Sequence, residues 1–155
     1  PEAKLQIAGA PIDDEFGDAK SYYEKLLKAT SSNKSIEYLG ELNKSEKYDL
    51  LIRSDIFCLP SSFRSEAVPL AIIEAMAAGC AIIVYDHKYL SMVVKDGVNG
   101  FVTAKNTPKN LAECLIQLAS DSNLRRRISK FNMEHAKLKF SEAKYKAEIQ
   151  KFVSS

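Results

Sequence analysis

Residues 59–79 read LPSSFRSEAVPLAIIEAMAAG, and this stretch indicates the fold class. It begins at the end of an apolar run, residues 55–59, that is typical of a central strand in a parallel sheet. A polar loop follows, and then a helical pattern over residues 69–78. That helix opens with Pro69 and closes at Gly79, which are common residues at a helix start and just after a helix end. The order strand, polar loop, helix predicts an α/β fold whose ligands bind at the carboxyl ends of the strands.

On both sides of this stretch, short apolar runs alternate with longer helical patterns. This alternation predicts successive βαβ units and therefore a Rossmann-like, doubly wound parallel sheet. Strands are predicted at residues 4–8, 35–39, 55–59, 81–84 and 100–102. Helices that cover the sheet are predicted at residues 18–29, 45–53 and 69–78, and a helical C-terminal tail at residues 108–120, 123–131 and 141–152. In the second of these helices, the face expected to cover the sheet carries Tyr48, Leu51 and Ile52.

Length and composition fit one domain. The 155 residues are 46% hydrophobic, which is enough for one core. We therefore predict a single domain over residues 1–155, with a βαβ core to about residue 104 and C-terminal helices from residue 105. A formal net charge of +2, from 22 basic and 20 acidic residues, argues against a nucleic-acid partner. No apolar run reaches the ~20 residues that a membrane span needs.

The three cysteines favour a reducing compartment. Cys58, Cys80 and Cys114 are far apart, and each is flanked by apolar residues. This pattern predicts buried free thiols in place of a disulfide framework or a metal site. Since no signal peptide is recognised at Pro1, we expect a cytoplasmic protein.

Two carboxylates lie on either side of the predicted helix start. Glu66 falls in the loop and Glu74 inside the helix, so both should face one cleft from different depths. The first-turn N–H groups of Leu70 and Ala71, together with the helix dipole, could hold a diphosphate without a metal or a lysine. Glu74 could then accept hydrogen bonds from the two vicinal hydroxyls of a ribose.

An ordered set of motifs surrounds these residues. Seven residues separate Glu66 from Glu74, and Pro60-Ser61 precedes the pair. The further motifs are AMAAG at residues 75–79, DGVNGFV at 96–102, LQIAG at 5–9 and IEYLG at 36–40. The set resembles the E-x7-E signature and flanking motifs of the retaining family 4 (group 1) glycosyltransferases. It corresponds to the C-terminal, nucleotide-sugar-binding half of their GT-B fold.

This resemblance implies a role for each site residue. Glu66 would contact hydroxyls of the transferred sugar as the catalytic residue, and Glu74 would bind the ribose. The implied donor-binding residues are Gly9, Gly40, Glu41, Leu42, Ala67, Val68, Pro69, Leu70, Ala71 and Glu74, with Arg64 as a candidate phosphate contact. The region after Gly40 would lie near the base. The resemblance implies no metal and no cofactor, because the nucleotide diphosphate sugar is a substrate, and we favour a UDP-sugar over a GDP-sugar.

The chain also departs from the family pattern. Ala67-Val68 stand where the family usually has a glycine or a phenylalanine-glycine pair, which would tighten access to the sugar and phosphate. The family's upstream arginine and lysine, and its N-terminal acceptor domain, are expected to lie outside these residues. Because preorganised cations stabilise a departing diphosphate, we expect the 155 residues alone not to catalyse transfer.

For the whole protein, the resemblance implies a retaining hexosyltransferase that acts on a glycan or lipid-linked acceptor. A role in bacterial surface polysaccharide synthesis (O-antigen, capsule or lipopolysaccharide) is expected, in the cytoplasm and compatible with peripheral contact at the inner membrane face. The run Arg125-Arg126-Arg127 is interpreted as a solvated helix face in preference to a lipid-binding one. Two alternatives stay open: a GT-B nucleotide-sugar epimerase or glycogen synthase-like enzyme, and a non-catalytic doubly wound regulatory module.

Overall fold

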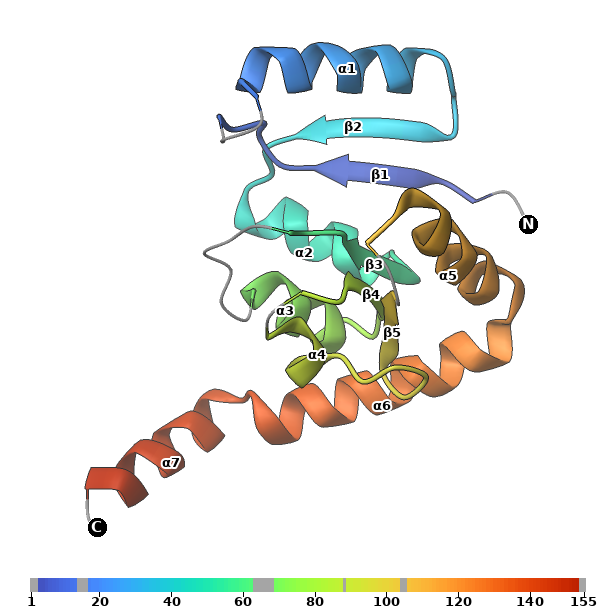
Figure 1. The fold of residues 1–155 in the computed structure, drawn as a ribbon. Helices are drawn as coiled ribbons and strands as arrows, with labels where there is room; N and C mark the ends of the chain where they lie inside the picture. The colour runs from blue at the N-terminus through green and yellow to red at the C-terminus, as the bar shows by residue number, and fades with distance from the viewer. Residues whose placement is uncertain (1–2, 14–16, 63–68, 88, 104–105, 154–155) are drawn as a thin grey trace. The chain divides into compact units, whose positions relative to one another are not determined.

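The computed structural model describes residues 3–13, 17–62, 69–87, 89–103 and 106–153. The chain divides into two compact units, Pro1–Lys47 and Tyr48–Ser155, and each is described by itself. Figure 1 shows the elements in chain order.

The first unit is a single βαβ step. It contains β1 (Leu5–Ala8), α1 (Ala19–Ser31) and β2 (Ile36–Gly40). The two strands pair in parallel, with Leu5 opposite Ile36, and α1 lies against β2. Helix α1 begins where the carboxylate of Asp18 accepts the N–H of Ser21 at 2.9 Å, which satisfies one of the N–H groups that a helix start leaves open.

The second unit is built around the strand β4. Helix α2 (Lys44–Ile52) leads into it, followed by β3 (Ile56–Leu59), α3 (Leu70–Ala77), β4 (Ala81–Tyr85), α4 (Leu90–Val93) and β5 (Gly100–Thr103). Three helices then complete the chain: α5 (Pro108–Ser120), α6 (Ser122–Lys139) and α7 (Glu142–Val153). The strand order is β3-β4-β5, and both pairs are parallel.

Helices cover both faces of this three-stranded sheet, as predicted for a doubly wound fold. On one face, Ile82 and Val84 of β4 pack with Ile72 and Met76 of α3. On the other face, Ala81 and Ile83 pack with Leu118 of α5 and with Leu124 and Ile128 of α6. Residues 81–84 are therefore buried on both sides, which explains why β4 is continuously apolar.

The predicted strands and helices are all present, but the prediction is wrong about the end of α6, about α4 and about Ile52. Helix α6 was predicted to end at Phe131 but runs to Lys139, because Asn132 and Ala136 continue its buried face through a polar stretch. The one-turn helix α4 was not predicted, since four residues are too few to show a helical period. Ile52 was expected to cover the sheet, but it is 69% exposed, and Leu51 provides the buried contact of α2.

The DGVNGFV motif forms a turn that side chains hold in place. Buried Asn99 accepts the N–H of Lys95 at 2.6 Å and donates to the carbonyl of Val93 at 2.9 Å. Asp96 accepts the N–H of Val102 at 3.0 Å. From α6, the amide of Asn132 donates to the carbonyls of Cys80 and Asn99 at 2.7 and 2.9 Å. In the described residues, this motif therefore has a structural role at the start of β5.

The three cysteines are free thiols, as predicted. Cys80 is buried, while Cys58 and Cys114 are partly buried in the core. Burial is the main reason that the pKa of Cys58 and that of Cys80 rise to about 11, and the neighbouring Cys114 raises the pKa of Cys58 further. A pKa of this size keeps both thiols protonated near neutral pH.

We therefore expect slow alkylation of Cys58 and Cys80 in the folded chain. Because the thiolate is the reactive form, a pKa near 11 lowers the alkylation rate at pH 8 about a hundredfold relative to an ordinary thiol near 9. Iodoacetamide labelling followed by peptide mass spectrometry, in buffer and in urea, measures this protection for each cysteine. Equal labelling of Cys80 under both conditions would contradict its placement in the core.

None of the helices in the described ranges is both long enough and apolar enough to cross a membrane.

Candidate functional site

The start of α3 has the geometry of an anion-binding site. Pro69 is the residue before the helix, with φ −66° and ψ 128°, where the sequence analysis had made it the first helical residue. Its carbonyl accepts the N–H of Ile72 at 3.0 Å. Leu70 and Ala71 form the first turn, where a helix supplies no acceptor for backbone N–H groups. These N–H groups and the positive end of the helix can attract an anion, and phosphate binding here remains a prediction.

Glu74 lies one turn further along α3 and is half-buried. Its Oε1 accepts a hydrogen bond from the hydroxyl of Tyr48 in α2, at 3.4 Å, while its Oε2 is buried. The carboxylate is thus bounded on two sides by protein. A carboxylate held in this way can accept further hydrogen bonds from a ligand hydroxyl, because each oxygen has two lone pairs.

Four of the predicted site residues fall between β3 and α3 in the sequence. Arg64, Glu66, Ala67 and Val68 lie outside the described residues. Their predicted roles, including catalysis by Glu66, therefore stay predictions, and the described part of the E-x7-E pattern is Glu74.

In the first unit, the structure brings Gly9 and Gly40 together at the carboxyl ends of β1 and β2. The N–H of Gly9 donates to the carbonyl of Gly40 at 2.8 Å, and the hydroxyl of Tyr38 donates to the carbonyl of Gly9 at 2.7 Å. Both glycines have positive φ, 130° and 70°, which favours glycine at these positions. The N–H and the carbonyl of Gly9 are thus already bonded within the unit. Its Cα is open, since a Cβ added there would meet nothing within 4 Å, and a nucleotide that bound here would contact the Cα and not the N–H.

A hollow of about 360 Å³ opens at this end of β1. Gly9, Tyr22, Leu26 and Tyr38 contribute to its mainly apolar lining. The next two predicted donor residues follow β2 directly: Glu41 is exposed and Leu42 is half-buried. Contact of these residues with a nucleotide base stays a prediction.

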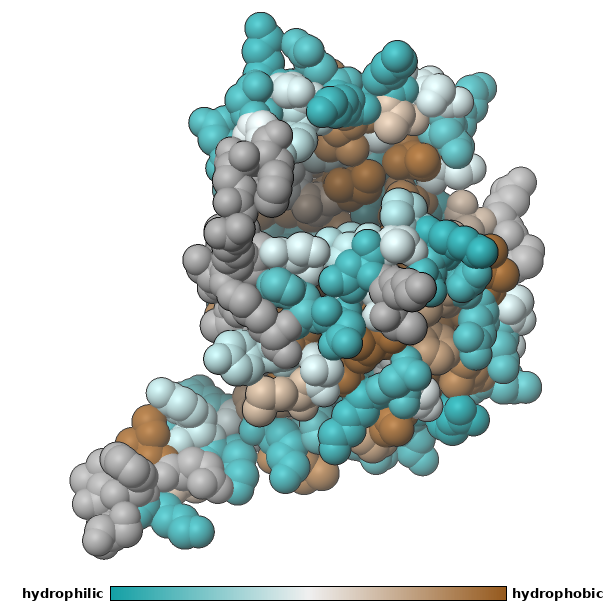
Figure 2. All heavy atoms as spheres, viewed as in Figure 1, coloured by the Kyte–Doolittle hydropathy of each residue, from teal (hydrophilic) through white to brown (hydrophobic). Residues whose placement is uncertain are grey.

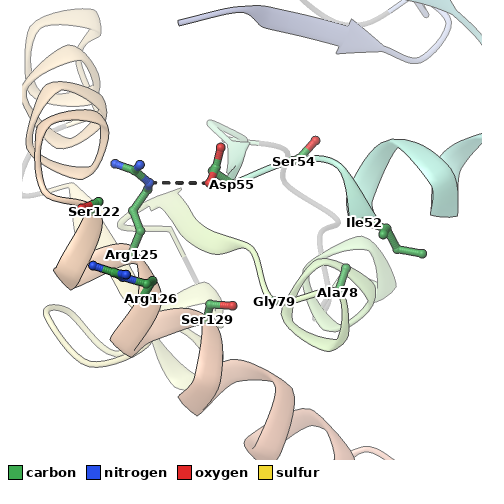
Figure 3. Close-up of a pocket in the computed structure, with 9 residues that line it drawn as sticks. All are labelled: Ile52, Ser54, Asp55, Ala78, Gly79, Ser122, Arg125, Arg126 and Ser129. Carbon is green, nitrogen blue, oxygen red and sulfur yellow. Dashed lines mark ion pairs between the residues drawn. The ribbon is translucent and has the colours of Figure 1, made fainter. Parts of the chain in front are cut away.

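In the second unit, a pocket of about 460 Å³ lies at the N-terminal ends of β3 and β4 (Figure 3). Asp55, just before β3, and Gly79, between α3 and β4, line it together with residues of α6. Arg125 donates to the carbonyls of Leu118 and Ala119 at 2.6 and 2.8 Å, and its Nε lies 3.7 Å from Asp55. Because its guanidinium caps the last carbonyls of α5, Arg125 has a structural role. None of the predicted site residues that the structure describes lines this pocket.

This contact corrects the prediction for Arg125, which was assigned to a solvated helix face. Arg126 and Arg127, which follow it, are exposed as predicted.

Figure 2 shows mixed hydrophilic and apolar side chains along the bottom of the view, where Figure 1 places α6. The apolar contribution of α6 includes Met133 and Leu138, both exposed.

Tyr48 is the site residue that the sequence analysis missed. The helical pattern assigned it to the face of α2 that covers the sheet, yet its hydroxyl contacts Glu74, 26 residues away. Nothing in the spacing of either helix indicates this contact, since it depends on how α2 and α3 pack. Among the residues that the structure describes, no group of three or more His, Cys, Asp or Glu side chains is arranged to hold a metal ion.

Comparison with solved structures identifies the class of fold. The chain is similar to Anabaena Alr3699/HepE, crystallised in complex with UDP and glucose, with a TM-score of 0.81 and 19% sequence identity over 98% of this chain and 40% of that one. The fold is therefore that of the GT-B glycosyltransferases.

The family follows from the sequence match. Residues 1–135 match the family model described as glycosyl transferases group 1, and the chain belongs to this family. It is 31% identical over 127 residues to the uncharacterized glycosyltransferase MJ1178 of Methanocaldococcus jannaschii, covering 81% of this chain and 35% of that protein. It is 28% identical over 151 residues to the poly(glycerol-phosphate) alpha-glucosyltransferase of Bacillus subtilis, covering 94% of this chain and 20% of that protein. The chain thus spans about a third or less of the length of these relatives.

Proposed function

We propose that this chain is the C-terminal, nucleotide-sugar-binding part of a retaining glycosyltransferase. The observation that carries the proposal is the placement of Glu74: a carboxylate held on α3, one turn after a helix start that can bind an anion. Membership in the group 1 glycosyltransferase family supports it. A nucleoside diphosphate offers both partners, a diphosphate for the helix start and a pair of ribose hydroxyls for the carboxylate.

In this proposal, each residue binds a different part of the nucleotide-sugar donor. The N–H groups of Leu70 and Ala71 bind the diphosphate, Glu74 binds the ribose, and Glu66 contacts the sugar that is transferred. Gly9, Gly40, Glu41 and Leu42 of the first unit contribute near the base. No metal or cofactor takes part, because the donor is a substrate and the helix start supplies the positive potential.

The proposal also specifies the donor nucleotide, the acceptor and the cellular location. UDP-sugar is favoured over GDP-sugar, and the complex of the similar HepE protein with UDP supports this choice. We propose a glycan or lipid-linked acceptor, as in bacterial surface polysaccharide synthesis at the cytoplasmic side of the membrane. The name of the Bacillus relative, a poly(glycerol-phosphate) alpha-glucosyltransferase, supports transfer to a polymer.

Calorimetric titration of the 155-residue chain with UDP, GDP and ADP tests the donor site. We expect selective binding, with UDP preferred. Glu74→Ala should weaken binding about 10- to 100-fold, because hydrogen bonds to a charged group contribute about 1.5–3 kcal/mol. Glu113→Ala, which removes an exposed glutamate of α5, is the matched control and should leave the affinity unchanged.

Two results would contradict the proposal. A folded chain that binds none of the three nucleotides would favour the regulatory-module alternative. Equal affinities of the wild-type chain and the Glu74→Ala variant would remove Glu74 from the site.

A further inference from the structure

Tyr48 and Glu74 meet between two helices of the second unit. The hydroxyl of Tyr48 lies 3.4 Å from Oε1 of Glu74, which is the long end of the range for a hydrogen bond. The side chain of Tyr48 is 37% exposed, so the phenol approaches the carboxylate from the surface. Oε2 of the same carboxylate is buried. Both oxygens of the Glu74 carboxylate are therefore held by the protein: Oε2 is buried, and Oε1 is bonded to Tyr48 of α2.

We infer that Tyr48 is a positioning residue for ribose recognition, holding Oε1 of Glu74 where a sugar hydroxyl can donate to it. The inference rests on the proposed function. An oxygen of a carboxylate has two lone pairs, so Oε1 can accept the phenol O–H and a ligand hydroxyl together. A side chain whose conformation is fixed before binding loses less conformational entropy when the ligand arrives, and this preorganisation increases affinity.

The attachment of α2 to the unit does not depend on this contact. Leu51 of the same helix is buried in the core, and its carbonyl accepts a hydrogen bond from the thiol of Cys80 at 3.4 Å. Just after the helix, the hydroxyl of Ser54 donates to the carbonyl of Leu50 at 2.7 Å. Removing only the Tyr48 hydroxyl therefore leaves the packing of α2 in place. Its effect should appear in ligand binding and not in stability.

The contact also has a consequence for specificity. Since Tyr48 acts through Glu74, and Glu74 acts through the ribose hydroxyls, Tyr48 should matter only for ligands that carry those hydroxyls. Loss of the phenol hydroxyl should lower the preference for a ribonucleotide over its 2′,3′-dideoxy form. A residue with a merely structural role would change both affinities by the same factor.

The experiment combines Tyr48→Phe with Glu74→Ala in a double-mutant cycle. Dissociation constants for UDP and 2′,3′-dideoxy-UDP are measured calorimetrically for the wild-type chain, both single variants and the double variant. We expect Tyr48→Phe to weaken UDP binding about three- to tenfold, the range for one hydrogen bond, and dideoxy-UDP binding less than about twofold. In the Glu74→Ala background, the same change should have almost no effect on UDP. Tyr145→Phe, at an exposed tyrosine of α7, is the matched control.

The outcomes separate this inference from the proposed function. Equal weakening of both ligands by Tyr48→Phe, or an undiminished effect in the Glu74→Ala background, would overturn the positioning role while leaving the donor site intact. A wild-type chain that binds UDP and dideoxy-UDP equally would remove the ribose role of Glu74, and both proposals with it. Thermal unfolding of each variant checks that Tyr48→Phe leaves the fold unchanged.

Discussion

Replacing Gly100 by alanine is expected to destabilise the second unit by about 3 kcal/mol or more, and it is one of the two largest effects that we predict. Gly100 is the first residue of β5 and pairs with Ile82 of β4. A Cβ at position 100 would overlap the carbonyl oxygen of Ile82 and lie 2.9 Å from its carbonyl carbon. Both atoms are backbone of a buried strand, so they cannot move aside as a flexible side chain could. The two strands would have to separate where the sheet is most buried.

Urea unfolding followed by circular dichroism measures this effect. Gly97→Ala is the matched control in the same turn, since Gly97 has φ +70° and an added Cβ there meets nothing within 4 Å. The control isolates the conformational cost of a positive φ, about 1 kcal/mol. If Gly100→Ala were no more destabilising than Gly97→Ala, the close approach of β5 to β4 would be refuted.

The sequence predicts the α/β fold well because short stretches of sequence determine each strand and helix of this fold. The apolar run of β4 is long and uninterrupted, and helices cover both faces of that strand. The limits of α3 are marked by Pro69 and Gly79, and the structure places the helix at Leu70–Ala77 between them. Periodicity and start and stop residues act within one turn or one strand, so they can be read without knowing how the elements pack.

The candidate site is predictable to a smaller extent. Placement of Glu74 on α3 follows from the helical pattern, and so does the position of Leu70 and Ala71 in its first turn. The contact with Tyr48 joins two helices 26 residues apart, and no local pattern specifies it. The bonded state of the Gly9 backbone likewise depends on pairing with a strand more than 25 residues away. These features arise from tertiary packing, which periodicity does not determine.

The DGVNGFV motif likewise combines features that local sequence predicts with contacts that only tertiary packing creates. Its presence supported the family resemblance, and its own Asn99 and Asp96 hold the turn, but the turn is also bonded from outside the motif by Asn132. That residue lies 33 positions from Asn99 and 52 from Cys80, within a polar run that the sequence analysis left outside the helix. A buried amide that reaches two carbonyls explains why α6 continues past Phe131. The turn before β5 is therefore partly specified by a residue of the C-terminal tail.

Asn132→Leu is expected to lower the free energy of unfolding by about 2–4 kcal/mol. Leucine has the branched shape of asparagine, but it is bulkier and cannot donate a hydrogen bond, so the buried site must also accommodate extra volume. The carbonyls of Cys80 and Asn99 would each lose a donor in a position where Asn132 is fully buried. A buried polar group that loses its partner costs about 1–3 kcal/mol, and the hydrophobic gain from leucine offsets part of the sum.

The same urea experiment measures this change, with Asn123→Leu as the matched control. Asn123 lies on the same helix but is exposed, and its side chain accepts a hydrogen bond from Arg126 at 2.6 Å. Its replacement should change the stability by less than about 0.5 kcal/mol, as is usual for surface sites. The slope of the unfolding free energy with urea should be the same in all three proteins, so that the shift in midpoint reports stability alone. If the two substitutions shifted the midpoint equally, Asn132 would not link α6 to the turn before β5, and the length of α6 would need another cause.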